Sequence, residues 1–241
     1  MTVTQDRYQK NLDFWEQAWS RVKEPVVKIP DALDYIPEIP QIFKEHGAKD
    51  IVDLACGTGW LSFFLNEHGF NMAGIDISES AIKMANEYLA KRKAIKPYEK
   101  LFETGLDASE INLDEVNFYQ QDIFAMDFPE KSFDGILINA AFEHLDYERG
   151  KEFLAKTKFL MRPGAIMFAV FDRVATGKKG EFEVLDDGTH QYTDEFRDGM
   201  FLRNYSDAEI KDLLAINDWE ILSFKKNKLE SRIVVARLNA N

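Results

Sequence analysis

The stretch IVDLACGTGW, residues 51–60, joins an apolar run to a turn that carries two glycines. The run is typical of a buried strand in a parallel sheet. Gly57 and Gly59 let the chain turn sharply and approach a ligand closely, because glycine has no Cβ. A dinucleotide-binding fingerprint requires a third glycine near position 62, where this chain has Ser62. The stretch therefore predicts a ligand-binding turn at a strand end, but not a nicotinamide dinucleotide site.

Strands and helices alternate along the chain on both sides of this stretch. Hydrophobic periodicity predicts helices over 5–21, 38–46, 60–68, 80–93, 147–161 and 206–216, and strands over 50–55, 71–76, 116–120, 133–139, 165–171, 218–225 and 231–237. Ser78 or Ser80 is expected to cap the helix over 80–93, and Pro163 and Gly164 to end the helix over 147–161. The alternation predicts an α/β fold, with a mostly parallel sheet covered by helices on both faces. The last two strands are joined by only a few residues around Asn227, too few for a helical crossover, so they are expected to pair antiparallel.

The length and composition favour one domain. The chain has 241 residues, 45% of them hydrophobic, and no repeat or linker rich in glycine and serine. We expect a single domain over 1–241. Its expected parts are an N-terminal helical cap or lid (1–47), a cofactor-binding core (48–171), a substrate-side insertion (172–205), and a C-terminal helix with strands (206–241).

Charge and cysteine content exclude several classes of function. The net charge of −12 opposes binding to a phosphate backbone, and the basic stretch KRKAIKPYEK at 91–100 is interpreted as a solvated helix end, so no nucleic-acid partner is expected. No apolar run reaches roughly 18 residues, and polar residues follow Met1, which predicts no membrane partner and a cytoplasmic location. The single cysteine, Cys56, and histidines without metal-ligand spacing predict no metal site.

Three acidic residues stand within or after three successive predicted strands. Asp53 lies inside the first, where it would disfavour a pyrophosphate and favour a ligand with an ammonium or sulfonium cation. Asp76, in GIDIS, is placed to accept hydrogen bonds from a ribose diol, and Asp122, in YQQDIFAMDF, from an exocyclic amine of an adenine. Each acid alone is better explained as a solvated or capping residue. Together at three strand ends they predict a nucleoside site.

The motifs VDLACGTG, GIDIS, QQDIFAMDF, FDGILINAAFEHL and MRPGAIMFAV occur in an order that resembles the class I S-adenosylmethionine-dependent methyltransferases. The resemblance covers roughly residues 48–237. It implies a Rossmann-like seven-stranded sheet, mostly parallel with an antiparallel last strand, and S-adenosyl-L-methionine as cofactor. The chain departs from the family in RPGA, where a double glycine often follows the proline.

The resemblance also implies roles for individual residues. The turn after the first strand would lie against the methionine part of the cofactor, with Asp53 near the ammonium group; its residues are Ala55, Cys56, Gly57, Thr58 and Gly59. Asp76 would hold the ribose hydroxyls, and Asp122 would face the adenine amine, while Ile77 and Ile123 would pack on the adenine ring. Asn139 and Ala140 would lie beside the sulfur that bears the methyl group.

A catalytic base is optional, because the sulfonium drives methyl transfer and the protein mainly aligns the reactants and excludes water. His144 is the best-placed titratable residue if the acceptor must lose a proton. The alternative is that His144 only stabilises the loop. NAAF, at 139–142, lacks the two prolines typical of enzymes that methylate nucleic-acid amines, which counts against a nucleobase acceptor.

Substrate contacts are expected from segments outside the core. YQKNLDFWEQAW, at 8–19, places Tyr8, Leu12, Trp15 and Trp19 on one helix face, either as a lid over the cofactor or as a core-packing stripe. The tryptophan pair is faintly similar to thiopurine methyltransferases, which suggests a small-molecule acceptor. In the long connection, Arg173 and Arg203 are candidates to bind a carboxylate, or simply form surface salt bridges, and Phe171, Tyr192 and Tyr205 are candidates for an apolar wall.

The sequence thus predicts methyl transfer from S-adenosylmethionine to a nitrogen, oxygen or sulfur of a small molecule. A nucleotide-dependent oxidoreductase is disfavoured by the missing third glycine. A protein methyltransferase is favoured only if the crevice is open and groove-like. A protein that binds S-adenosylmethionine without catalysis would keep the same three acids.

Overall fold

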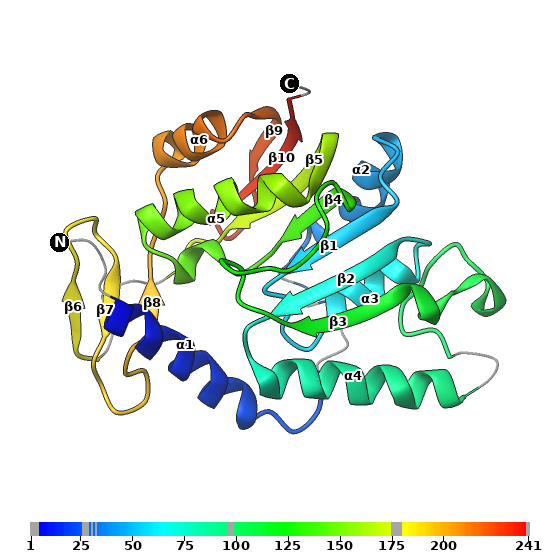
Figure 1. Cartoon of the computed structure of the whole chain (residues 1–241), viewed down its shortest axis with the longest axis horizontal. Helices are drawn as coiled ribbons and strands as arrows, with labels where there is room; N and C mark the ends of the chain where they lie inside the picture. The colour runs from blue at the N-terminus through cyan, green and yellow to red at the C-terminus, as the bar shows by residue number, and fades with distance from the viewer. Residues whose placement is uncertain are drawn as a thin grey trace.

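The computed structural model describes residues 5–25, 29, 31, 33–95, 99–174 and 180–239. Seven strands form one sheet in the order β3-β2-β1-β4-β5-β10-β9 (Figure 1). They are β1 (Asp50–Leu54), β2 (Asn71–Asp76), β3 (Val116–Gln120), β4 (Phe133–Ile138), β5 (Met161–Phe171), β9 (Trp219–Lys226) and β10 (Arg232–Leu238). The pairs from β3 to β5 are parallel, whereas β10 is antiparallel to both β5 and β9. The predicted sheet with one reversed last strand is confirmed.

Helices cover both faces of this sheet. They are α1 (Gln5–Ser20), α2 (Ile39–Glu45), α3 (Trp60–Asn66), α4 (Glu79–Ala94), α5 (Tyr147–Leu160) and α6 (Asp207–Ile216), with short 3-10 turns η1 (Ile36–Glu38), η2 (Ala108–Glu110), η3 (Leu113–Glu115) and η4 (Phe142–His144). One buried cluster joins the sheet to α5 and α6, and a second joins it to α2, α3 and α4. Ser78 is the residue that caps α4, since its hydroxyl accepts from the amide of Ala81.

Strand β5 begins earlier than its predicted bound of 165. Helix α5 ends at Leu160, and Met161 already pairs with Phe133 of β4. Pro163 and Gly164 therefore lie inside the strand instead of ending the helix, as the sequence had suggested. The β4–β5 register shifts between Phe133 and Gly135, and such an irregularity tolerates a proline, which has no N–H for the ladder.

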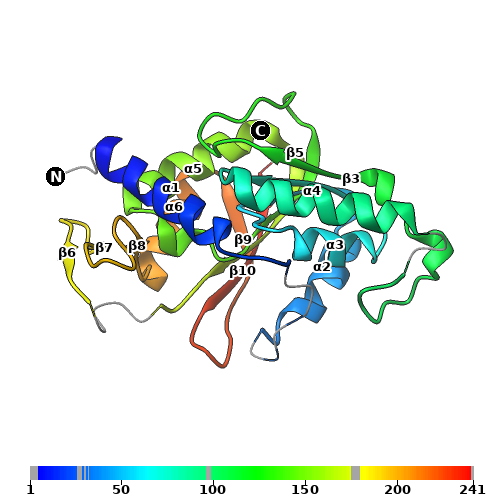
Figure 2. The same cartoon turned by 90° about the horizontal axis from the view of Figure 1, so that it is seen from below.

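The connection after β5 contains a second, smaller sheet that the sequence analysis did not predict. Its strands β6 (Phe182–Val184), β7 (His190–Tyr192) and β8 (Phe201–Leu202) pair antiparallel in that order. Figures 1 and 2 show α1 running from this small sheet to the start of α4, across the carboxyl ends of the parallel strands. Helix α1 and the small sheet, which were both predicted to lie outside the cofactor-binding core, thus meet at the sheet edge where ligands bind in such folds.

The irregular stretch from 99 to 115 is tied to the core by Glu67, which is fully buried. Its carboxylate accepts hydrogen bonds from the amides of Leu101 and Phe102 and forms an ion pair of 2.6 Å with Arg92 of α4. This stretch follows three residues that lie outside the described part of the chain. Among the described helices, none is long and apolar enough to cross a membrane.

Candidate active site

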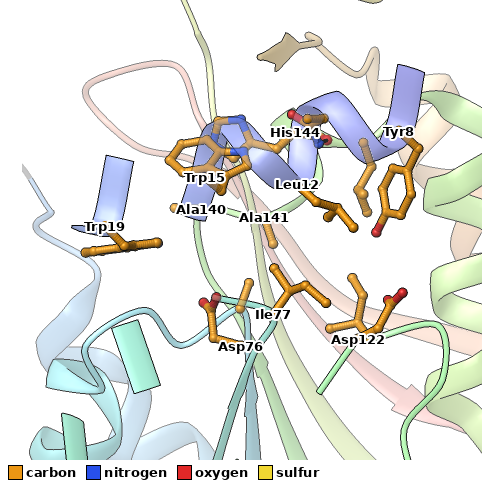
Figure 3. Close-up of a pocket in the computed structure, with 14 residues that line it drawn as sticks. Tyr8, Leu12, Trp15, Trp19, Asp76, Ile77, Asp122, Ala140, Ala141 and His144 are labelled. Atoms are coloured by element: carbon orange, nitrogen blue, oxygen red, sulfur yellow. Dashed lines mark hydrogen bonds between the residues drawn. The ribbon is translucent and has the colours of Figure 1, made fainter. Parts of the chain in front are cut away.

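A pocket lies between α1 and the loops that follow β1 to β4. Figure 3 shows Tyr8, Leu12, Trp15 and Trp19 of α1 on one side and Asp76, Ile77 and Asp122 on the other. The full lining is Tyr8, Asn11, Leu12, Trp15, Trp19, Ala55, Asp76, Ile77, Asp122, Ile123, Ala140, Ala141, His144 and Leu145. Most of these side chains are apolar, and a few polar groups stand among them, as is typical of a small-molecule site.

Asp76, the last residue of β2, is held rigidly at the floor of the pocket. One carboxylate oxygen accepts from the amide of Gly57 at 2.8 Å, and the other accepts from the amide of Ser78 at 2.9 Å. Burial raises the pKa of Asp76, while these two bonds act in the opposite direction. The side chain is only 6% exposed, yet it lines the pocket. Asp76 is therefore oriented before any ligand arrives.

The turn after β1 requires glycine at two positions. Gly57 has φ +54°, and a Cβ there would lie 2.7 Å from a ring carbon of Trp19. Gly59, which caps α3, has φ +78°, and a Cβ would lie 2.3 Å from the ring of Phe118. At each of the two positions, the positive φ and the close aromatic ring explain why the residue is glycine.

Two alanines that line the pocket also adopt left-handed backbone conformations. Ala55 follows β1 with φ +58°, and Ala140 follows β4 with φ +55°. Such conformations cost a residue with a Cβ free energy and are concentrated at functional sites. No sequence pattern indicated this strain.

Asp53 lies under the turn and does not line the pocket. Its carboxylate accepts from the hydroxyl of Ser62 at 2.7 Å, and both side chains are buried. Burial raises the pKa of Asp53 to about 7, against the effect of the Ser62 hydrogen bond, and the charge of Asp76 adds to the increase. Ser62, at the position of the missing third glycine, is thus the partner that a buried carboxyl requires.

Helix α1 is fixed over the pocket by side chains at several points. Glu16 accepts from the hydroxyls of Ser78, at 2.6 Å, and Ser80 at the start of α4. The buried amide of Asn11 donates to the carbonyl of His144 and accepts from the amide of Phe201, on β8. The helix therefore contacts the large sheet's loops, α4 and the small sheet together.

His144, on η4, has a defined tautomer. Its Nδ1 lies 3.1 Å from the carbonyl oxygen of Phe201, which only accepts, so Nδ1 carries the proton and Nε2 has the lone pair. Burial lowers the pKa of His144 to about 4, so the ring is neutral at pH 7. The ring of Trp15 packs against it at a tilt of 60°, with a centroid distance of 4.3 Å.

Comparisons with known proteins agree with this geometry. Residues 52–169 match the family model described as a methyltransferase domain. The chain is 26% identical over 194 residues to the ubiquinone biosynthesis O-methyltransferase of Coxiella burnetii (strain RSA 331 / Henzerling II), covering 77% of this chain and 71% of that protein.

Two solved structures show the same fold. A protein from Pyrococcus horikoshii OT3 superposes with a TM-score of 0.69 at 19% identity, covering 92% of this chain and 99% of that one. The 1,6-didemethyltoxoflavin-N1-methyltransferase of Burkholderia thailandensis, solved with 1,6-didemethyltoxoflavin and S-adenosylhomocysteine, superposes with a TM-score of 0.61 at 17% identity, covering 87% and 80%. The matched domain and the relatives identify the chain as an S-adenosylmethionine-dependent methyltransferase. Its cofactor is S-adenosylmethionine.

Ten of the residues predicted for the site of this methyltransferase line the pocket. They are Tyr8, Trp15, Trp19, Ala55, Asp76, Ile77, Asp122, Ile123, Ala140 and His144. Four lining residues, Asn11, Leu12, Ala141 and Leu145, were not predicted as site residues. Leu12 shares the predicted α1 face with Trp15 and Trp19, so the helical spacing already marked it.

Other predicted residues of the methyltransferase lie beside or behind the pocket. Cys56 and Thr58 are buried in the turn, and the amide oxygen of Asn139 accepts from the hydroxyl of Tyr35 at 2.8 Å. Phe171 is buried in a stack on Phe142, with ring centroids 4.0 Å apart. None of these four predicted residues lines the pocket.

The predicted substrate residues of the long connection are likewise placed away from the pocket lining. Arg203 is buried and pairs with Asp187, at 3.0 Å, and with Glu209. Tyr192 is fully buried, with Arg197 over its ring. Arg173 has an exposed side chain. Among the described residues, no group of three or more histidine, cysteine or acidic side chains is placed to hold a metal ion.

The pocket lining contains the residues that the sequence predicted for a nucleoside, with one restriction. Asp76 offers carboxylate oxygens, Ile77 and Ile123 offer flat apolar contact, and Asp122 stands beside them. The Trp19 ring, however, lies directly against Gly57, where the methionine part is predicted. If the methionine part binds in this turn, as predicted, the Trp19 ring would have to shift.

Proposed function

We propose that this methyltransferase acts on a small-molecule acceptor in the pocket beneath α1. The observation that carries the proposal is the roof itself: α1 lies across the strand ends and is fixed at Asn11 and Glu16. A roofed, largely apolar pocket suits a small acceptor. A protein methyltransferase would require an open groove at this edge, which α1 covers.

The proposed roles of the chain's residues follow their places in the pocket. Asp76 accepts from the ribose hydroxyls, Ile77 and Ile123 pack against the adenine, and Asp122 accepts from its amine. The turn of Ala55, Cys56, Gly57, Thr58 and Gly59 receives the methionine part, with Asp53 beneath it. Asn139 and Ala140 lie beside the sulfur.

When bound, the cofactor supplies an electrophilic methyl group. The chain's own residues align the acceptor in line with that group and exclude water, and Trp15 and Leu12 of α1 supply the apolar cover. His144 is neutral with a lone pair on Nε2, so it accepts a proton from an acceptor that must lose one. Its low pKa makes it a weak base, suited to a proton that leaves during the transfer.

The proposed partners and compartment rest on the composition. The acidic net charge of −12 supports an acceptor other than nucleic acid. The single cysteine fits a reducing compartment such as the cytoplasm. We likewise propose the division into a cap (1–47), a cofactor-binding core (48–171), an insertion (172–205) and a C-terminal part (206–241) within one domain.

Calorimetric titration with S-adenosylmethionine, S-adenosylhomocysteine and NAD tests the ligand assignment. The first two should bind and NAD should not. Asp76→Asn should weaken S-adenosylmethionine binding by roughly 10- to 150-fold, because a hydrogen bond to a charged group contributes about 1.5–3 kcal/mol. Asp127→Asn, at an exposed carboxyl outside the pocket lining, is the control and should bind as the parent does. Equal affinity in both variants would remove Asp76 from the ribose site.

A further inference from the structure

The hydroxyl of Tyr8 stands at one end of the pocket without an assigned ligand. The Tyr8 side chain is only 3% exposed, yet it lines the pocket. Figure 3 shows the hydroxyl pointing into the pocket, toward the carboxylate of Asp122. No hydrogen bond joins this hydroxyl to another of the described residues. A buried polar group at a pocket wall ordinarily has a partner, and here a ligand can supply it.

The ring that carries this hydroxyl is held in place from several sides. It packs edge-on against Phe124, with ring centroids 5.5 Å apart, and the guanidinium of Arg149 lies 3.8 Å from its centroid. Three residues further along α1, Asn11 joins the helix to the loop after β4 and to the small sheet. The hydroxyl of Tyr8 is therefore oriented before any ligand arrives.

Tyr8 and Asp122 offer opposite hydrogen-bonding groups to a ligand. Oδ1 of Asp122 accepts from the amide of Phe124 at 2.9 Å, and its second oxygen has no partner among the described residues. A carboxylate accepts hydrogen bonds, whereas the O–H of a tyrosine donates one. Burial raises the pKa of Tyr8, and the charge of Asp122 adds to the increase, so the hydroxyl keeps its proton. This end of the pocket thus presents an acceptor next to a donor.

Such a pair of groups is complementary to one edge of an adenine. The exocyclic amine of adenine donates, and the ring nitrogen next to it has a lone pair that accepts. A purine with an oxygen in place of the amine offers a second acceptor there, which a carboxylate repels. Ile77 and Ile123, which also line the pocket, supply apolar contact for the ring itself.

The position of Tyr8 along the pocket relates it to the base of the cofactor. In Figure 3, Ala140, which is proposed to lie beside the sulfur, stands on one side of Ile77, and Tyr8 and Asp122 stand on the other. In the cofactor the ribose separates the sulfur from the adenine, and Asp76 is the residue proposed for the ribose. The sequence placed Tyr8 among the substrate contacts, but the structure brings it next to the residue proposed for the adenine amine.

We propose that Tyr8 is a specificity-determining residue for the cofactor: its hydroxyl donates to the ring nitrogen beside the adenine amine, while Asp122 accepts from that amine. This inference rests on the proposed function, because it takes the place of the adenine from it. Helix α1 is then part of the cofactor site as well as the roof of the pocket, and the two side chains together select adenine over a purine that lacks the amine.

The test uses calorimetry on the full chain with S-adenosylhomocysteine and its 1-deaza and 7-deaza analogues, in which a C–H replaces one of the ring nitrogens on either side of the amine. Tyr8→Phe keeps the ring and removes the hydroxyl. It should weaken S-adenosylhomocysteine binding at least about fivefold, because a buried lone pair loses its donor. One of the two analogues should bind the parent chain more weakly by a similar factor, and Tyr8→Phe should not weaken that analogue further.

The matched control is Tyr88→Phe, at a partly buried ring on α4 outside the pocket lining, which should bind all three ligands as the parent does. If S-adenosylhomocysteine binds Tyr8→Phe and the parent equally, the inference is overturned and the methyltransferase assignment stands. If Tyr8→Phe weakens S-adenosylhomocysteine and both analogues by the same factor, Tyr8 acts through packing alone, which also overturns it. If S-adenosylhomocysteine does not bind the parent chain, the proposed function itself fails.

Discussion

The substitution Gly57→Ala tests whether Trp19 closes the pocket against the glycine turn. An alanine at φ +54° costs about 1–2 kcal/mol in backbone conformation. Its Cβ would also lie 2.7 and 2.9 Å from two ring carbons of Trp19, and overpacking of this kind costs about 1–3 kcal/mol. We therefore expect the free energy of unfolding to fall by about 2–5 kcal/mol, or the melting temperature by about 4–20 °C for a chain of this size.

The design isolates the ring contact with a matched glycine and a double-mutant cycle. Gly47 has φ +72° and nothing within 4 Å of an added Cβ, so Gly47→Ala should cost only the backbone part, about 1–2 kcal/mol. Urea unfolding, followed by far-UV circular dichroism, is measured for Gly57→Ala in the parent and in Trp19→Ala. In the Trp19→Ala background, the loss of unfolding free energy caused by Gly57→Ala should fall to the loss caused by Gly47→Ala. An equal cost in both backgrounds would show that Trp19 does not rest on Gly57.

Three further predictions concern charged groups. The folded pKa of Asp53, about 7, is above its usual 3.8, so its contribution to stability is complete below about pH 4 and on the order of 4 kcal/mol is lost by pH 7. Asp53→Asn should flatten the pH dependence of the unfolding free energy over this range, and unchanged slopes would contradict the burial argument. Arg92→Met should lower the free energy of unfolding in urea by about 3–5 kcal/mol, because it leaves Glu67 buried without its cation. Lys93→Met, which breaks an exposed pair with Asp114, should lower it by under about 1 kcal/mol in the same measurement. Glu16→Gln should weaken the attachment of α1 to α4 by roughly 1 kcal/mol and speed amide hydrogen exchange within 5–20. The control is Glu24→Gln, at an exposed carboxyl, and equal exchange rates in the two variants would refute the attachment.

Much of the fold could be predicted because each main strand is a short apolar run next to a clear helical pattern. The β1 to β4 strands and helix α4 lie within a residue or two of their expected bounds. The small sheet was missed because β8 has two residues, and β6 and β7 have three, too short for an alternating pattern. The early start of β5 was missed because Pro163 and Gly164 are typical helix stops, and only the pairing of Met161 with Phe133 overrides them.

The pocket was predictable where its residues stand at strand ends, because a parallel sheet brings those ends to one edge. Asp76, Asp122 and Ala140 were found in this way. Asn11 was not, because a polar residue in a helix is ordinarily a solvated one, and its partners lie 133 and 190 residues away in sequence. Arg203 was misleading for a related reason: a lone arginine in a long loop gives no sign of the two acids that bury it.

The double role of Asn11 limits how this enzyme can be recombined with its relatives. One amide group supports the loop after β4 through the His144 carbonyl and the small sheet through the Phe201 amide. The backbone carbonyl of Lys10 also comes so close to Gly199 that a Cβ there would lie 2.5 Å from it. A chimera that takes the small sheet from a relative but keeps α1 would bury an amide with no partner and press a side chain into the helix. The two segments form a single exchangeable unit, and crossover points in a library belong outside both.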